Sequence, residues 1–122
     1  MKQLQDVIDY LKLDMMKHVV HLKQIEAYAD HLTWHYEQGG SEVGVLLLFP
    51  TRAIPFDAVK YPNTAFVVFL AASSPALAER VVRLVPRDQP LIFKLVDDLT
   101  REAVLSTFPV TRVTSYTSYT SS

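Results

Sequence analysis

The sequence predicts a mixed α/β domain in which helices cover both faces of one sheet. Apolar residues recur at helical spacing near the N-terminus, an alternating stretch and an apolar run flank Gly39-Gly40 as in an antiparallel hairpin, and a strand, a helix and a strand follow over residues 64–96. Such a strand–helix–strand unit makes a right-handed crossover between parallel strands. The 122 residues show no internal repeat, so we expect one domain over 1–122, either complete or cut from a longer chain.

Two helices are expected before the sheet. The first spans residues 3–13, and its apolar residues share one face: Leu4, Val7, Ile8 and Leu11. Asp14 can cap a second helix that continues to about residue 30. We expect this second helix to bury a stripe with Val20 and Ile25 at its edges. The stripe comprises Met15, Val19, Leu22 and Ala29.

A hairpin is expected next. Alternating residues from Leu32 to Glu37 lead into Gly39-Gly40, where glycine accepts the positive φ of a tight turn, and Val43–Phe49 returns. Pro50 and Pro55 bracket what reads as a short irregular strand, and the stretch KYPN at residues 60–63 predicts a turn.

The crossover unit is the most ordered part of the pattern. Thr64–Ala72 is almost wholly apolar, as in a strand covered on both faces. Ser74-Pro75 then starts a helix that Pro86 ends, and Leu91–Val96 is the parallel partner strand. The helix carries one apolar stripe: Ala78, Val81, Val82 and Val85.

A last helix and an edge strand are expected at the C-terminus. The helix runs over residues 99–108 and is capped by Asp97 or Asp98. From Val110 onward the chain is rich in Thr, Ser and Tyr, which favours a strand, and Arg112 is its single charge. Because so little charge protects this edge, we expect it to pair with another sheet or a second copy.

Composition excludes several classes of function. A net charge of −1 argues against a nucleic-acid or anionic-membrane partner, and the absence of cysteine excludes thiolate chemistry and disulfides. The longest apolar runs, 43–49 and 65–72, are too short to cross a bilayer, and the charged N-terminus does not read as a signal peptide. A cytoplasmic protein is expected.

The predicted order of helices and strands, with the stretches HVVHLKQIEAYADH (18–31) and GVLLLF (44–49), resembles the GNAT superfamily of N-acetyltransferases. It is most similar to the N-terminal half of two-domain members. The resemblance implies a GNAT-like mixed sheet with antiparallel N-terminal strands and a parallel β-α-β crossover. It also implies that acetyl-coenzyme A would sit where the two parallel strands splay apart.

The loop that should hold the coenzyme pyrophosphate departs from the family pattern. By position it is Ala71–Ala76, which has no glycine and no arginine, and Pro75 removes one amide donor. Ser73 and Ser74 are the candidate coenzyme-binding residues, but they first read as a helix cap. No catalytic residue carries over, because Thr64–Ala72 holds no carboxylate and the last helix holds no tyrosine.

The remaining polar clusters read as structural. His18 and His21 share a helical face, but no third metal ligand completes a site, so we expect both to be partly exposed beside an apolar stripe. His31 and His35 flank the start of the hairpin. Four aromatic residues can either line a ligand cleft or pack in a core: Trp34, Tyr36, Phe49 and Phe56.

Three functions stay open. The first is a GNAT-like domain without activity or bound coenzyme by itself, which acts as a structural or substrate-shaping half beside a second GNAT domain or in a homodimer joined at the C-terminal edge. The second is an active N-acetyltransferase that binds acetyl-coenzyme A through an atypical loop. The third is a small-ligand-binding or regulatory module. No metal is expected in any of them.

Overall fold

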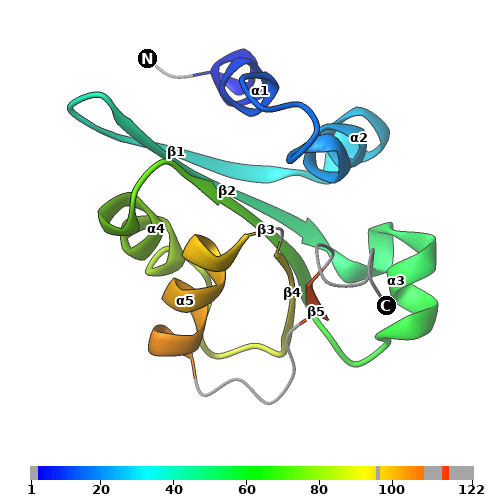
Figure 1. Cartoon of the computed structure of the whole chain (residues 1–122). Coiled ribbons are helices and arrows are strands. Elements are labelled where there is room, and N and C mark those ends of the chain that lie inside the picture. Colours follow the sequence, from blue (N-terminus) through cyan, green and yellow to red (C-terminus); the bar gives the residue numbers. More distant parts are fainter. Residues whose placement is uncertain (1–2, 96, 109–113, 116–122) are drawn as a thin grey trace.

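The fold is a single mixed sheet between two layers of helices (Figure 1). This computed structural model describes residues 3–95, 97–108 and 114–115. Its helices are α1 (Leu4–Lys12), α2 (Val19–Tyr28), α3 (Pro55–Lys60), α4 (Pro75–Val82) and α5 (Asp98–Thr107), with short 3-10 helices η1 (Ala29–His31) and η2 (Thr51–Ala53). Its strands are β1 (Thr33–Gly39), β2 (Glu42–Pro50), β3 (Phe66–Ala72), β4 (Leu91–Leu95) and β5 (Thr114–Ser115).

The strands follow one another across the sheet in chain order. β1, β2 and β3 pair antiparallel, whereas β3 with β4 and β4 with β5 pair parallel. The predicted fold class is therefore confirmed, including the parallel crossover through α4. The predicted C-terminal edge strand is present as Thr114–Ser115, and the rest of the segment from Val110 lies outside the described residues.

The two faces of the sheet bury separate cores. Alternate residues of β2 and β3 point to opposite faces, so each strand supplies both cores. Val45, Leu47 and Phe69 pack under α1 and α2, whereas Leu46, Leu48 and Leu70 pack under α4 and α5. This arrangement explains why these strands read as continuous apolar runs.

The hairpin turn and the approach of α4 both depend on glycine. Gly40 has φ +63° and begins the two-residue turn between Gly39 and Glu42. Gly44 lies directly under α4, where an added Cβ would come within 2.9 Å of the Leu77 carbonyl oxygen and of Val81 Cγ1. The absence of a side chain at residue 44 lets the helix approach the strand this closely.

The second helix differs from the prediction in its phase. Residues 13–18 form turns, α2 begins only at Val19, and the Asp14 carboxylate accepts the backbone N–H of Lys17 rather than capping the helix. The predicted apolar stripe is wrong, because Met15, Val19 and Ala29 are exposed. The face that α2 buries consists of His18 at its N-cap, His21 and Ile25.

The segment between Pro50 and Pro55 is helical, so the predicted irregular strand is wrong. Pro55 occupies the first turn of α3, where its fixed φ suits a helix and its missing N–H is not needed. This helix buries Asp57, whose carboxylate oxygens lie 2.7 and 2.9 Å from Lys94 Nζ on β4. The pair anchors α3 beside the parallel strands.

Three smaller predictions about helix caps and helix packing are confirmed. Ser74 Oγ accepts the Leu77 N–H as the N-cap of α4, and all four residues of the predicted α4 stripe are buried. Asp97, and not Asp98, caps α5. None of the helices in the described ranges is long and apolar enough to cross a membrane.

Candidate functional site

The site with the most unusual chemistry lies at the carboxyl ends of the parallel strands. The described pairing of β3 with β4 ends at Phe69 and Lys94, although β3 continues to Ala72. Ser73 N–H donates to Val43 O on the β2 side, and backbone groups alternate along a strand. The Leu70 carbonyl therefore points to the β4 side, just beyond the last paired residue.

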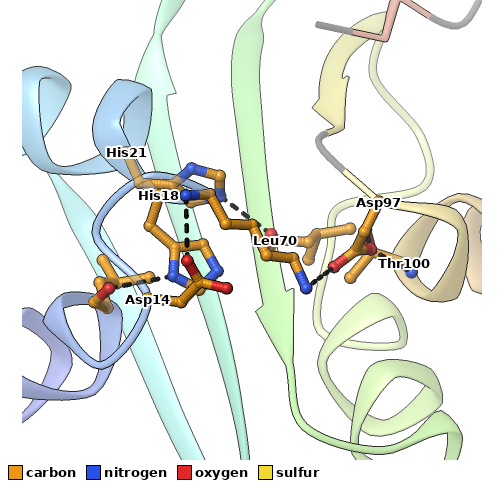
Figure 2. Close-up of polar contacts among 8 residues, drawn as sticks. Asp14, His18, His21, Leu70, Asp97 and Thr100 are labelled. Atoms are coloured by element: carbon orange, nitrogen blue, oxygen red, sulfur yellow. Dashed lines mark hydrogen bonds and ion pairs between the residues drawn. The ribbon is translucent and has the colours of Figure 1, made fainter. Parts of the chain in front are cut away.

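A histidine from α2 occupies this position (Figure 2). His21 is fully buried, and its Nε2 lies 2.9 Å from the Leu70 carbonyl oxygen. Because a carbonyl only accepts, Nε2 must carry the hydrogen. Nδ1 is then an acceptor, and it has no hydrogen-bond partner among the described residues. Burial lowers the pKa of His21 to about 4, so the ring is neutral.

His18 forms the second layer of the cluster. Its Nδ1 lies 3.0 Å from the Leu11 carbonyl oxygen, which fixes the hydrogen on Nδ1 and ties the start of α2 to the end of α1. Its ring meets that of His21 edge to face, with centroids 5.2 Å apart. Burial lowers the pKa of His18 as well. Two neutral imidazoles therefore meet edge to face between the helices and the sheet.

An ion pair closes the side of the cluster nearest α5. Lys17 Nζ lies 2.7 Å from Asp97 Oδ2, while Asp97 Oδ1 accepts both the backbone N–H and the hydroxyl of Thr100 (Figure 2). Burial alone would raise the pKa of Asp97, but hydrogen bonds from Lys17 and Thr100 together hold it below its usual value. The pair joins the start of α2 to the start of α5 across the strand ends.

The candidate coenzyme residues from the sequence lie nearby but are already engaged. Ser73 Oγ accepts the Val43 N–H at 2.8 Å, and Ser74 Oγ caps α4 at 3.3 Å. Pro75 has no N–H to offer. The helix start therefore carries a structural cap, as the sequence predicts.

The arrangement offers little for chemistry on an external substrate. His21 has a free lone pair, but it is enclosed, and a general base must reach the proton that it removes. The described residues contain no group of three or more His, Asp or Glu side chains that could hold a metal. Polar side chains close the carboxyl ends of β3 and β4, and we call His21, Lys17 and Asp97 together the plug.

A shallow depression lies beside the cluster, between α1 and the hairpin. It is lined by Asp6, Asp9, Tyr10, Leu13, Tyr36 and Val43. Burial, with the neighbouring Asp97 and Tyr36, raises the pKa of the Tyr10 hydroxyl. The predicted aromatic set does not form one cleft, because Phe49 is in the core, Phe56 is 64% exposed on α3, and Trp34 and Tyr36 pack against the α1 and α2 side of the sheet.

No protein-family model, curated protein or solved structure matches this chain.

The expectation that His18 and His21 are partly exposed is wrong, since 5% and 0% of their surfaces are accessible. Their spacing correctly places both on one helical face. The spacing does not indicate that the face with the two histidines, rather than the predicted apolar stripe, packs on the sheet. A polar group at a strand end can compete with an apolar stripe when it satisfies a buried carbonyl, as His21 does at Leu70.

Proposed function

We propose that this chain is a GNAT-like domain that is non-catalytic by itself and acts as a structural or substrate-shaping half beside a second domain of the same type. The observation that carries the proposal is the plug of His21, Lys17 and Asp97 at the carboxyl ends of β3 and β4. In working members of the family that the chain resembles, acetyl-coenzyme A enters between the parallel strands. In this chain the Leu70 carbonyl, which faces this space, is already hydrogen-bonded to the His21 side chain.

The loop after β3 supports the same proposal. A pyrophosphate needs several converging donors, which glycine-rich loops supply through their backbone amides. In this chain the Leu77 N–H is bonded to Ser74, the Ser73 N–H is bonded to Val43, and Pro75 has none. Each charge-assisted hydrogen bond that is lost costs roughly 1.5–3 kcal/mol. Losing two weakens coenzyme binding by about two to four orders of magnitude.

The two alternatives make different demands on the structure. An active N-acetyltransferase would have to displace His21 and break the Lys17–Asp97 pair before coenzyme enters. A small-ligand module would use the depression beside Tyr10 and Tyr36, which is open and shallow. The proposal includes a cytoplasmic location for the chain.

Calorimetric titration with acetyl-coenzyme A tests the proposal. We expect no heat of binding at micromolar ligand and no shifts of the backbone amide signals of residues 70–78 in a parallel NMR titration. A micromolar dissociation constant that is weakened by Ser73→Phe, but not by the matched change Ser106→Phe on exposed α5, would overturn the proposal and favour the enzyme.

A further inference from the structure

Among the described residues, no strand pairs with the outer edge of β1, and this edge is well suited to pairing. β1 stands at one end of the strand order, and its seven residues contain no proline and no lysine. Natural edge strands are usually protected by such residues, by a bulge or by being very short. The register of β1 with β2 is continuous from Thr33 to Gly39, so no bulge interrupts it.

The hairpin determines which backbone groups face outward. Gly39 and Glu42 flank a two-residue turn and form a hydrogen-bonded pair, so every second residue back along β1 also bonds to β2. The N–H and C=O groups of Trp34, Tyr36 and Gln38 consequently point away from the sheet. Arg80 Nη1 donates to the Gln38 carbonyl at 3.3 Å, which confirms its outward direction and leaves its second lone pair.

These groups match a second copy of the same strand. When two β1 strands run antiparallel about a two-fold axis at Tyr36, Trp34 pairs with Gln38 of the other copy and Tyr36 pairs with itself. All three outward N–H groups then find a carbonyl on the opposite strand. A two-fold contact of this kind is closed and self-complementary.

Side chains select this register over its neighbours. It places His35 opposite Glu37 of the other copy, where an imidazole N–H can donate to a carboxylate. A shift of two residues toward the N-terminus puts His35 opposite His35 and loses the pair with Glu37. The opposite shift puts Glu37 opposite Glu37, where the two carboxylates repel each other. The Glu37 carboxylate can accept this hydrogen bond, since its contact with Arg80 is long, at 4.0 Å, and its side chain is only partly buried.

We propose that two copies of this chain pair antiparallel through β1, centred on Tyr36, and join their sheets into one. This dimer goes beyond the proposed function, and its test does not involve coenzyme.

Cysteine cross-linking tests the register directly, because the chain has no cysteine of its own. An equimolar mixture of His35→Cys and Glu37→Cys chains should form a covalent dimer under mild oxidation, since directly opposed residues lie within disulfide reach. Each variant alone should cross-link at least about tenfold more slowly, because its cysteines are then offset along the strands beyond about 7 Å.

Sedimentation equilibrium supplies the second readout. Tyr36→Pro removes an outward N–H from each copy and keeps the β1–β2 bonds, which come from His35 and Glu37. It should raise the dimer dissociation constant by about tenfold or more. A chain that stays monomeric at every concentration, or a mixture that cross-links no faster than either variant alone, would overturn the proposal. A dimer unaffected by a folded Tyr36→Pro chain would do the same.

Discussion

At the scale of single residues, His21 shows how a buried polar group is tolerated when one of its atoms is satisfied. Its Nε2–H meets the Leu70 carbonyl, while Nδ1 has no partner among the described residues. An unpartnered neutral acceptor costs roughly 1–3 kcal/mol. A charged imidazolium at the same place would cost more, because charge is removed from water. The fold therefore keeps this histidine neutral.

Stability should consequently fall in mild acid. The pKa of His21 is about 4 in the folded chain and 6.5 when exposed, so the unfolded chain binds a proton first as the pH drops. The contribution of neutral His21 to the free energy of unfolding is complete above pH 6.5 and is lost progressively as the pH falls toward 4. Its full size is about 3 kcal/mol, at about 1.4 kcal/mol per pKa unit. Urea unfolding at a series of pH values measures this loss.

His21→Gln provides the matched variant, since its amide can donate to Leu70 without titrating. We expect its pH profile to be flatter in this window, with the remaining slope due to His18, whose pKa is lowered too. His31→Gln makes the same exchange at the exposed end of η1, away from the buried cluster, and serves as the control. The same slope in His21→Gln as in the parent chain would contradict the assignment. The contribution of the Asp97 carboxylate to the free energy of unfolding is lost only at lower pH, because its pKa lies below the usual carboxyl value.

The two adjacent carboxylates at the start of α5 should behave differently. Asp97→Ala removes the N-cap and leaves Lys17 without its partner, so we expect a loss of about 1–3 kcal/mol in the free energy of unfolding. Asp98→Ala, at an exposed position one residue later, should change it by less than about 0.5 kcal/mol. Equal effects in urea melts would show that the cap does not depend on Asp97.

At the scale of secondary structure, α4 depends on the strand beneath it. Gly44 makes room for the Leu77 carbonyl and Val81, and Ser74 and Pro75 start the helix at the right distance from β3. Local signals and packing agree here, which is why this unit could be predicted well.

Val81→Asp should unfold the chain or bring it close to unfolding. Val81 is fully buried between α4 and the sheet, and an unpaired carboxylate there costs several kcal/mol. A small domain has roughly 5–15 kcal/mol of stability in total. Ala76→Asp, on the exposed first turn of the same helix, is the control and should melt within a few degrees of the parent chain. A melting temperature of Val81→Asp that matches this control would show that the face is not buried.

At the scale of the whole molecule, one sheet carries two cores and two edges. The edge at β4 is covered by β5, of which two residues are described, whereas no strand in the described ranges pairs with the longer outer edge of β1. The sequence predicts self-association through the segment from Val110, and this stays a prediction. Two associating edges on one sheet would build an open chain of copies rather than a dimer.

Removal of residues 110–122 distinguishes self-association through β1 from self-association through the C-terminal edge. If β1 is the contact, as we expect, light scattering should give the same dimer for the shortened chain, provided that circular dichroism shows it folded. Loss of the dimer in a folded shortened chain, together with an unaffected Tyr36→Pro chain, would instead assign self-association to the C-terminal edge.

The sequence by itself determined the elements whose causes are local. Gly40 at the hairpin turn, Ser74-Pro75 at the start of α4, the α4 stripe and the apolar runs of β2, β3 and β4 all act through neighbouring residues. Strand order followed from the lengths of the connections, because a short turn makes an antiparallel pair and a helix between strands makes a parallel one.

Only the tertiary structure decided what fills the strand ends. The hydrogen bond from His21 to Leu70 joins residues 49 apart, and the pair of Lys94 with Asp57 joins residues 37 apart. Periodicity tells which residues share a face of a helix, but not which face another element covers. Burial of His18 and His21, the Lys17–Asp97 bridge and the pairing of Asp57 with Lys94 therefore depend on contacts that no local pattern records, since each is stabilised by a partner distant in the chain.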